Sequence, residues 1–485
     1  MPSLTATLHL QSPRYTPRRI PWSSRLIGLC VPVVFVVLLL QAFLRQGLAI
    51  WSVGIAYILY DTVLLVFTAW QIRDLRGGPA AGTTLFGAAG PSFGVIVAAH
   101  DEGRIIRQTI DRLLAQEEPP EVILIADDGS SDGTAAALLD AYGIEQADLG
   151  MIASTAVRST RLQWLRLPHG GKARALNAAL ERIATDVVLT VDADTLLERG
   201  AIAAMRAAFA AEPELVATTG VLIPICGPSL KERLFEWFQS YEYVRNFLSR
   251  DAWMRLDSLL LVSGAFAAFR RDAVLTVGGF DPDCLVEDYE LIHRLHRHAA
   301  DTGLDWRVRV VGGAVARTDA PAGVRAFLKQ RQRWFGGFLQ TQHWNRDMVG
   351  APRYGRLGTR MLPVKALDTM QPIYGLGAFA ILVGLIATGR FVLAFPILLV
   401  MIAKIAVDLT FHLWSLGIYK RWTGRREGLA LGPAIAAAVL EPFTFQLLRH
   451  AGAIYGWVAF LRGRQNWSRS SRTAFGDDAE MATSR

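Results

Sequence analysis

Two apolar runs near the start of the chain constrain the fold more than any other feature of the sequence. Residues 27–44 contain no charged side chain, and residues 48–70 contain only Asp61. Each run is long enough to cross a bilayer as a helix. Only Arg45-Gln46-Gly47 separates them, which does not resemble the cleavage region of a signal peptide. The pattern predicts an N-terminal tail and transmembrane hairpin over residues 1–76, with both ends of the hairpin in the cytoplasm.

Apolar sequence returns in the C-terminal third of the chain. Residues 373–388 and 391–418 predict two further spans, followed by a basic loop at residues 420–426. Residues 429–461 are apolar but are interrupted by two polar pairs, Glu441-Pro442 and Arg449-His450. A single span would place the basic tail outside, whereas a hairpin or a re-entrant piece would keep it inside, as the charge distribution favours. We predict a transmembrane region at 346–465 and a cytoplasmic tail at 466–485.

Composition supports membrane insertion and argues against nucleic acid as a partner. Hydrophobic residues make up 52% of the 485 residues and charged residues 19%. The net charge of +8 comes from basic residues clustered beside the apolar runs, which the positive-inside rule explains. The three cysteines lie far apart and contain no C-x-x-C pair, so neither a disulfide framework nor a zinc site is indicated.

Between the apolar ends, the sequence has the alternation of an α/β domain. A Gly-, Ala- and Pro-rich linker is predicted at 77–92, and the domain at 93–345. Short apolar strands are predicted at 93–99, 122–126, 162–167 and 187–191, separated by helical patterns, which indicates βαβ units and a mainly parallel sheet. Two aromatic-rich helices, at 231–250 and 327–344, have the composition of helices at a membrane surface, although core helices would also fit.

Polar clusters follow each predicted strand, at the sheet edge where α/β proteins bind ligands. Asp192 and Asp194 follow the fourth strand one residue apart, so both carboxylates can face one point. Oxygen ligands of this kind suit Mg²⁺ or Mn²⁺ bound together with substrate phosphates. Taken alone, the same pair would equally be two acids in a solvated loop.

Other polar residues near the strand ends have chemically plausible roles, each with a structural alternative. Asp128 could accept the imide N–H of a uracil, or cap a turn. Lys172 could place a cation on a diphosphate, although neither a P-loop nor a G-x-G-x-x-G element is present. Asp288 could act as a general base, or be an acid favoured at a helix N-terminus.

The segment Gln330-Arg331-Gln332-Arg333-Trp334 combines two guanidinium groups with an indole. Arginine is suited to phosphate oxygens and tryptophan to stacking on a sugar or a ring. Within the predicted span 391–418, Lys404, Asp408 and His412 fall on one helix face. With Asp61, they could line a polar channel, or Lys404 and Asp408 could form a pair that only packs.

The order of these motifs resembles that of processive membrane family-2 glycosyltransferases, which include cellulose, hyaluronan and poly-N-acetylglucosamine synthases. The series is His100-Asp101-Glu102, Asp127-Asp128-Gly-Ser, Lys172-Ala-Arg-Ala-Leu-Asn177, Asp192-Ala-Asp194, Gly264 ahead of Phe269-Arg270-Arg271, Glu287-Asp288, and Gln330-Arg-Gln-Arg-Trp334. The resemblance implies a GT-A type nucleotide-sugar domain inserted between membrane helices.

The resemblance also implies a role for each matched residue. The UDP-sugar would be bound by Glu102, Asp127, Asp128, Lys172, Asp192, Arg331 and Arg333; a metal ion by Asp194 and Asp192; and the acceptor by Gly264, Glu287, Gln330 and Trp334, with Asp288 as the base. Asp101 stands where Asn is usual, and Val286 stands where cellulose synthases have Thr. The second departure favours an amino-sugar polymer or a related exopolysaccharide.

Together these features predict an inverting, Mg²⁺- or Mn²⁺-dependent UDP-sugar transferase in a bacterial inner membrane, with a cytoplasmic catalytic domain. It would elongate a β-linked polysaccharide and pass it through its own helices, with export subunits in the envelope as candidate partners. A non-processive transferase acting on a lipid acceptor, and a transporter or nucleotide sensor using Lys404, Asp408 and His412, are the alternatives. The sugar itself is not encoded by any spacing rule.

Overall fold

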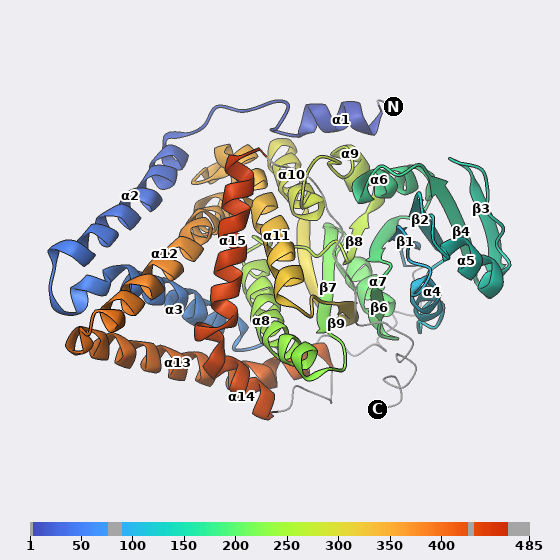
Figure 1. Ribbon diagram of the computed structural model, residues 1–485. Coiled ribbons are helices and arrows are strands. Elements are labelled where there is room, and N and C mark those ends of the chain that lie inside the picture. Colours follow the sequence, from blue (N-terminus) through green and yellow to red (C-terminus); the bar gives the residue numbers. More distant parts are fainter. Residues whose placement is uncertain (1–2, 76–89, 425–430, 464–485) are drawn as a thin grey trace.

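The computed structural model describes residues 3–75, 90–424 and 431–463. A helical group lies on one side of the molecule and a single twisted sheet on the other (Figure 1). The helices are α1 (Leu4–Gln11), α2 (Trp22–Leu44), α3 (Ser52–Ile72), α4 (Ile106–Leu114), α5 (Thr134–Tyr142), α6 (Lys172–Arg182), α7 (Ala201–Ala211), α8 (Leu230–Met254), α9 (Arg271–Thr276), α10 (Glu287–Thr302), α11 (Val324–Trp344), α12 (Leu362–Ala387), α13 (Phe391–Thr423), α14 (Leu431–Leu440) and α15 (Phe445–Leu461).

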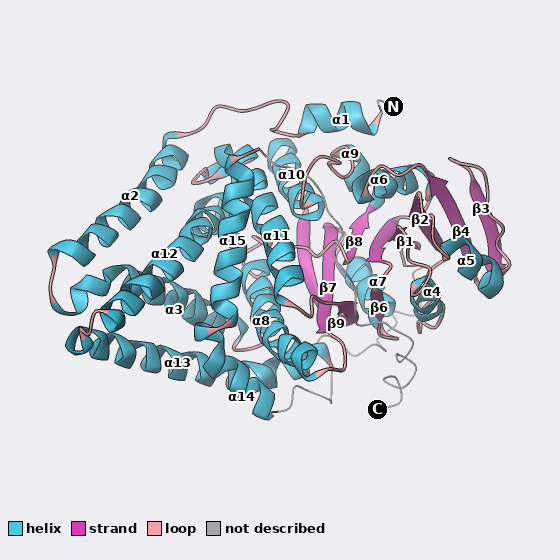
Figure 2. Ribbon diagram, in the orientation of Figure 1, coloured by secondary structure: helices cyan, strands magenta, loops and turns pink. Residues whose placement is uncertain are grey.

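The sheet has nine strands in the order β3-β4-β2-β1-β5-β8-β7-β9-β6 (Figure 2). The strands are β1 (Phe93–Ala99), β2 (Val122–Asp128), β3 (Ile152–Val157), β4 (Thr160–Leu167), β5 (Val187–Asp192), β6 (Thr195–Leu197), β7 (Leu215–Ile225), β8 (Phe266–Arg270) and β9 (Arg307–Asp319). The run β4-β2-β1-β5 is parallel, whereas β3, β6 and β8 pair antiparallel with their neighbours. The α/β class is confirmed, and the sheet is mixed.

The four predicted strands correspond to β1, β2, β4 and β5, and they form the parallel part of the sheet. Three of them, β1, β2 and β5, were recognisable because their side chains are buried on both faces, which produces continuous apolar runs. β4 mixes buried positions with exposed and half-buried ones. The other strands were not predicted. β9, for example, alternates buried and half-buried positions and contains three arginines and two glycines, so its composition does not stand out from a loop.

The strand register brings the polar clusters to one edge, as the sequence predicts. Ala98 of β1 lies beside Asp192 of β5, and Ala99 lies beside Asp127 of β2. Asp128 in turn pairs with Leu167 of β4, just ahead of His169. The carboxyl ends of four neighbouring strands therefore deliver these residues to a single region.

Four stretches are long and apolar enough to cross a membrane: Trp22–Leu44, Gly47–Ile72, Leu357–Ala387 and Phe391–Thr423. The third begins well before residue 373, where the sequence predicted it, because Pro372 lies inside α12 instead of starting it. Proline is tolerated within membrane helices, so it was a poor boundary signal. The last apolar stretch forms a pair of helices bent by 50°, as a broken span or a re-entrant piece would be.

Both ends of the α2–α3 hairpin contact the α/β domain. At the start of α2, the Ser24 hydroxyl donates to the Arg346 carbonyl, 2.5 Å away. At the end of α3, Phe67 packs on Trp253 of α8, and Asp74 pairs with Arg255. The two ends thus lie on one side, in agreement with the predicted hairpin.

Some predicted segments fall outside the described residues. The linker at 77–92 is described only from residue 90, the basic loop 420–426 only to residue 424, and the tail 466–485 not at all. The domain boundaries and the membrane-surface position of α8 and α11 stay predictions. The three cysteines, all within the described chain, are free thiols.

Candidate active site

A cavity of about 780 Å³ opens at the carboxyl edge of the sheet, between the strand ends and helices α8, α10 and α11. Most of the residues predicted for the site line it: Glu102, Asp128, Lys172, Asp192, Asp194, Gly264, Glu287, Asp288, Gln330, Arg331, Arg333 and Trp334. These positions span more than two hundred residues of sequence, so the fold is what assembles them.

The Asp192-Ala193-Asp194 pair spans the end of β5 and the turn that leads to β6. The two aspartates are therefore not in one continuous strand, although both still face the cavity. Asp192 Oδ1 lies 2.5 Å from the Lys172 ammonium, which is itself 3.7 Å from Glu287 Oε1. Burial opposes the charge on Lys172, but Asp192 and Glu287 outweigh it and raise the pKa of the ammonium. Lys172 therefore stays protonated and bridges β5 to α10.

Asp288 occupies the first turn of α10, where it is held by two backbone donors. The Gly264 N–H donates to Oδ2 at 2.6 Å, and the Tyr289 N–H donates to Oδ1 at 2.7 Å. A side chain at position 264 would place its Cβ 3.0 Å from the Asp288 carboxylate, so glycine suits this position. Burial raises the pKa of the neighbouring Glu287, while Lys172 opposes that shift.

Asp127, also predicted as a nucleotide ligand, is engaged by two protein groups. Its Oδ1 accepts the Ser130 N–H at 2.8 Å, and its Oδ2 accepts the indole N–H of Trp164 at 3.1 Å. The side chain is buried and is not part of the cavity lining. Asp127 therefore caps the turn after β2, the structural alternative for this motif.

Asp128 faces the cavity but also organises the loop ahead of Lys172. Its carboxylate accepts the N–H groups of Gly170 at 2.7 Å and Gly171 at 2.9 Å. Gly129, at φ +72°, lets this loop approach, since a Cβ there would lie 2.7 Å from the His169 nitrogen. Only the carboxylate lone pairs that do not accept these backbone N–H groups can therefore bind a base.

Two sets of side chains offer metal ligands. Asp192 and Asp194 provide oxygen atoms only, at the same cavity edge as Lys172, and fit a hard ion such as Mg²⁺ or Mn²⁺. The second set is His100, Asp128 and His169, whose ligand atoms lie within 4.8 Å of one another. Imidazole nitrogens suit other metals, and the Asp128 carboxylate is already bound to backbone N–H groups. Asp192 is likewise engaged, by the Lys172 ammonium, and Asp194 lines the same cavity.

Arg331 lines the cavity and is also paired with a buried carboxylate. Its guanidinium lies 2.8 Å from Glu242 of α8, and both side chains are buried. It also lies over the Trp334 ring, 4.4 Å from the centroid. The Glu242 pair uses only one of the guanidinium nitrogens, and Arg331 also lines the first cavity. Arg333 faces the cavity and contacts the Leu285 carbonyl at 3.5 Å.

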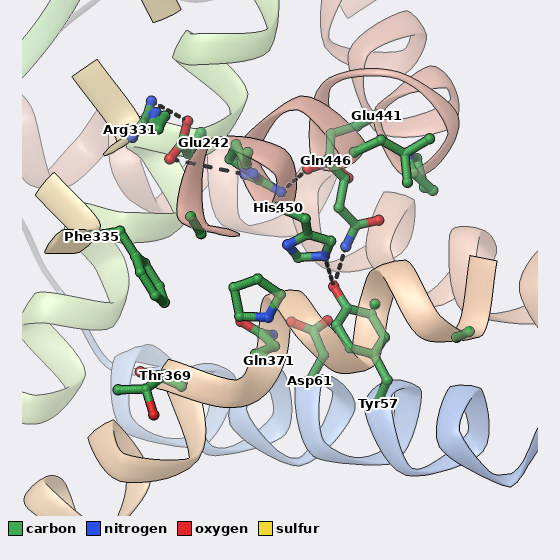
Figure 3. A pocket seen from close by; sticks show the side chains of 18 of the residues that line it. Tyr57, Asp61, Glu242, Arg331, Phe335, Thr369, Gln371, Glu441, Gln446 and His450 are labelled. Atoms are coloured by element: carbon green, nitrogen blue, oxygen red, sulfur yellow. Dashed lines mark hydrogen bonds and ion pairs between the residues drawn. The ribbon is translucent and has the colours of Figure 1, made fainter. Parts of the chain in front are cut away.

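A second cavity, of about 400 Å³, lies among the membrane helices and the bent α14–α15 pair (Figure 3). It meets the first cavity around Trp334, because both are lined by Glu242, Asn246, Leu261, Arg331, Trp334 and Phe338. Helix α15 packs closely here, since a Cβ on Gly456 would lie 2.9 Å from the Gly336 nitrogen of α11. Trp334 therefore stands where the two cavities join.

The membrane cavity is polar but electrically balanced. Five acidic residues (Asp61, Glu242, Asp368, Asp408, Glu441) and five basic residues (Arg245, Arg331, Lys365, Lys404, Arg449) line it. Each basic group pairs with an acidic one, in some cases across helices, as Lys404 does with Asp61 at 2.6 Å and with Asp408. His412, by contrast, packs on Tyr241 and does not line the cavity.

Two features of the first cavity were not predicted. The imidazoles of His100 and His169 stack with centroids 4.4 Å apart, although the residues are far apart in sequence. Arg250 of α8 also lines the cavity, and burial lowers its pKa to about 10 although Asp288 opposes the shift. Arg250 has no motif signal, because it stands at the end of a helix expected at a membrane surface. His100 and His169 each follow a predicted strand, and the sheet register brings their rings together.

Comparisons with known proteins agree with this geometry. Residues 91–337 match the model of the family described as glycosyltransferase like family 2. A poly-beta-1,6-N-acetyl-D-glucosamine synthase of Staphylococcus epidermidis is 26% identical over 249 residues, which cover 50% of this chain and 53% of that protein. The protein of the same name from Staphylococcus aureus (strain COL) is 28% identical over 291 residues, covering 59% and 61%. The chain thus spans between about half and three fifths of these relatives' lengths.

A solved structure shares the fold. A mannosyltransferase from Pyrobaculum calidifontis, in complex with GDP-Man and Mn²⁺, superposes with a TM-score of 0.52 at 20% identity. The match covers 81% of this chain and 99% of the mannosyltransferase.

Proposed function

The chain belongs to glycosyltransferase family 2, and from this premise we propose that it transfers a sugar from a UDP-sugar to a growing β-linked polysaccharide. The observation that supports this most directly is the junction of the two cavities at Trp334. A transferase that releases its product to solvent needs no polar passage among membrane helices. One that extends a polymer can place the acceptor at Trp334 and the finished end in the membrane cavity.

In this proposal the donor lies along the strand edge. Asp128 and Glu102 would face the base of the donor. Both residues line the cavity, and the Glu102 side chain is buried in its wall. Lys172 and Arg333 offset the charge of the diphosphate from two sides, because they belong to α6 and α11. Arginine and lysine both bind phosphate oxygens through charge-assisted hydrogen bonds.

Asp192 and Asp194 would hold the divalent ion, Mg²⁺ or Mn²⁺. When bound, such an ion stabilises the charge that develops on the leaving diphosphate. Lys172, already 2.5 Å from Asp192, would keep this carboxylate oriented and lie near the same phosphate oxygens.

Asp288 would take the proton from the attacking acceptor hydroxyl. The two backbone N–H groups that bind its oxygens fix the carboxylate plane while leaving lone pairs for the hydroxyl. One base and one stabilised leaving group are sufficient for a single in-line displacement, which inverts the configuration at the sugar. Gln330, Glu287 and Gly264 surround this point in the cavity wall.

The balanced charges of the membrane cavity favour a neutral, polar occupant. A charged substrate would have to break one of the ion pairs, whereas the hydroxyl and amide groups of a sugar polymer can hydrogen-bond to them and stack on the aromatic rings. The names of the two staphylococcal relatives favour an N-acetylglucosamine polymer. The catalytic domain would lie in the cytoplasm of a bacterium, where nucleotide sugars are made.

Product length tests the proposal. The purified protein in lipid nanodiscs, given radiolabelled UDP-N-acetylglucosamine with Mg²⁺ or Mn²⁺, should form a polymer and release UDP, with UDP-glucose as the comparison donor. Asp288→Asn should lower turnover by about 100-fold or more while UDP still binds. A product of one sugar on a lipid would refute the polymer and support the non-processive alternative. No UDP release from any donor would refute the transferase assignment of this site.

A further inference from the structure

The N-terminal arm, residues 3–19, lies against the α/β domain ahead of the first membrane helix (Figure 1). Ser3 caps the N-terminus of α1, and Leu8 in the second half of this helix is buried. Helix α1 packs directly on Gly278. This residue has φ +91°, and a Cβ there would lie 2.3 Å from the Leu8 nitrogen, so only glycine fits. This close fit indicates a specific docking site for α1.

Arg14 ties the arm to the loop that leads to α10. Its guanidinium lies 3.3 Å from Asp281 and 3.3 Å from Asp283, and 5.1 Å from the ring centroid of Trp344. The Asp281 side chain is completely buried. Burial opposes the charge on Arg14, but Asp281 outweighs it and raises the pKa of the guanidinium. A buried carboxylate paired in this way fixes the backbone on which it sits.

The loop held by Arg14, residues 277–286, connects the helices that form the active site. Phe280 exchanges two hydrogen bonds of 2.8 Å with the Asn177 side chain of α6, the helix that begins with Lys172. Arg294 of α10 donates to the Gly279 carbonyl at 2.7 Å. The Leu285 carbonyl accepts from Arg333 of α11. The loop then enters α10 at Glu287 and Asp288.

We propose that Arg14 is a positioning residue for the transfer reaction: through Asp281 it fixes the loop 277–286, and thereby the first turn of α10 and the Asp288 carboxylate. The inference rests on the proposed role of Asp288. Arg14 does not line the cavity and touches no substrate. Its effect would therefore fall on the turnover rate, since small displacements of a reacting group slow the reaction strongly without changing how the donor binds.

The arm offers a matched control. Arg18 pairs with Asp301 at 3.0 Å near the other end of α10, away from the loop. Arg14→Gln removes the ion pairs with Asp281 and Asp283, and Arg18→Gln removes the pair with Asp301. If the arm only anchors the chain, the two variants should behave alike. If Arg14 positions the loop, only Arg14→Gln should alter catalysis.

The test measures UDP release with UDP-N-acetylglucosamine, thermal stability and hydrogen–deuterium exchange of the full-length protein in nanodiscs. Arg14→Gln, assayed well below its Tm, should lower kcat by roughly 10- to 100-fold with KM nearly unchanged. Its Tm should fall by about 3 °C, because the buried Asp281 carboxylate loses its partner. Arg14→Lys should recover part of both losses, and Arg18→Gln should match the wild type. Exchange over residues 277–290 should rise in Arg14→Gln alone. Exchange does not depend on activity, so unchanged protection of this loop overturns the inference even if the proposed function fails. A loss of kcat equal in both variants, or one that only follows a lower Tm, overturns it as well.

Discussion

The ion pair between Arg331 and Glu242 gives the sharpest test of how the site is built. Both side chains are at most 9% exposed, and 2.8 Å separates their charged atoms. At an effective dielectric constant of about 20, their attraction is about 6 kcal/mol, much of which offsets the cost of burying both charges. Glu242→Gln leaves the guanidinium of Arg331 buried without its partner, so we expect a loss of about 3 kcal/mol.

For a chain of 485 residues, the unfolding entropy is about 1 kcal/mol per degree, so Tm should fall by about 3 °C. Arg331→Met should lower Tm by a similar amount. The double variant should be more stable than either single one, because neither charge is then buried alone. Differential scanning calorimetry in one detergent gives all four Tm values of the cycle.

UDP binding separates this role from the predicted one. Arg331→Met should leave the affinity for UDP within about twofold of wild type, whereas Arg333→Met should weaken it by about tenfold, the loss of one charge-assisted hydrogen bond. Isothermal titration calorimetry measures both. If Arg331→Met weakens UDP binding as much as Arg333→Met does and leaves Tm unchanged, Arg331 is a phosphate ligand and the assignment to Glu242 is wrong.

Three further outcomes follow from the site and its surroundings. Lys172→Met should raise the KM for the donor at least tenfold, measured by UDP release. The substitution removes the cation next to the diphosphate and the bridge between Asp192 and Glu287. A KM close to that of the wild type would count against this role. EDTA should stop UDP release, and either Mg²⁺ or Mn²⁺ should restore it. In Asp194→Ala neither ion should restore the release. Full activity of the wild type in EDTA would contradict a metal site. Burial lowers the pKa of His293 to about 3 from its ordinary 6.5, so the unfolded chain binds a proton that the folded one does not as pH falls below 6.5. Stability should then fall by up to about 1.4 kcal/mol per pH unit, and His293→Gln should flatten the dependence of Tm on pH between 6.5 and 4.5.

Local sequence patterns were sufficient for the parts of the fold whose side chains have uniform surroundings. β1, β2 and β5 are central, parallel and buried on both faces, so their apolar runs identify them. The residues after each strand could be assigned to one edge because parallel strands share a direction. The strands β6 to β9 and the N-terminal helix α1 were missed, since each depends on contacts with segments far away in the chain. β3 pairs with the adjacent β4, but it is only half-buried and so lacks an apolar run.

The site itself divides in the same way. Asp288, Gly264 and Trp334 were predicted from the order of motifs, and all three line the cavity. The same motifs did not separate Asp127 from Asp128, or Arg331 from Arg333. In both cases neighbouring residues of the same type point in different directions, and the partner that decides the role, Trp164 or Glu242, lies elsewhere in the sequence.

The sequence by itself therefore determined that an α/β domain lies between apolar helices, because hydrophobic runs and strand-end motifs are local properties. Only the tertiary structure decided which residues meet: Lys172 with Asp192, Arg331 with Glu242, Arg14 with Asp281, and the two cavities at Trp334. The physical reason is that such pairings depend on how whole helices pack, and a side chain's charge acquires its role from the burial and the partner that packing provides.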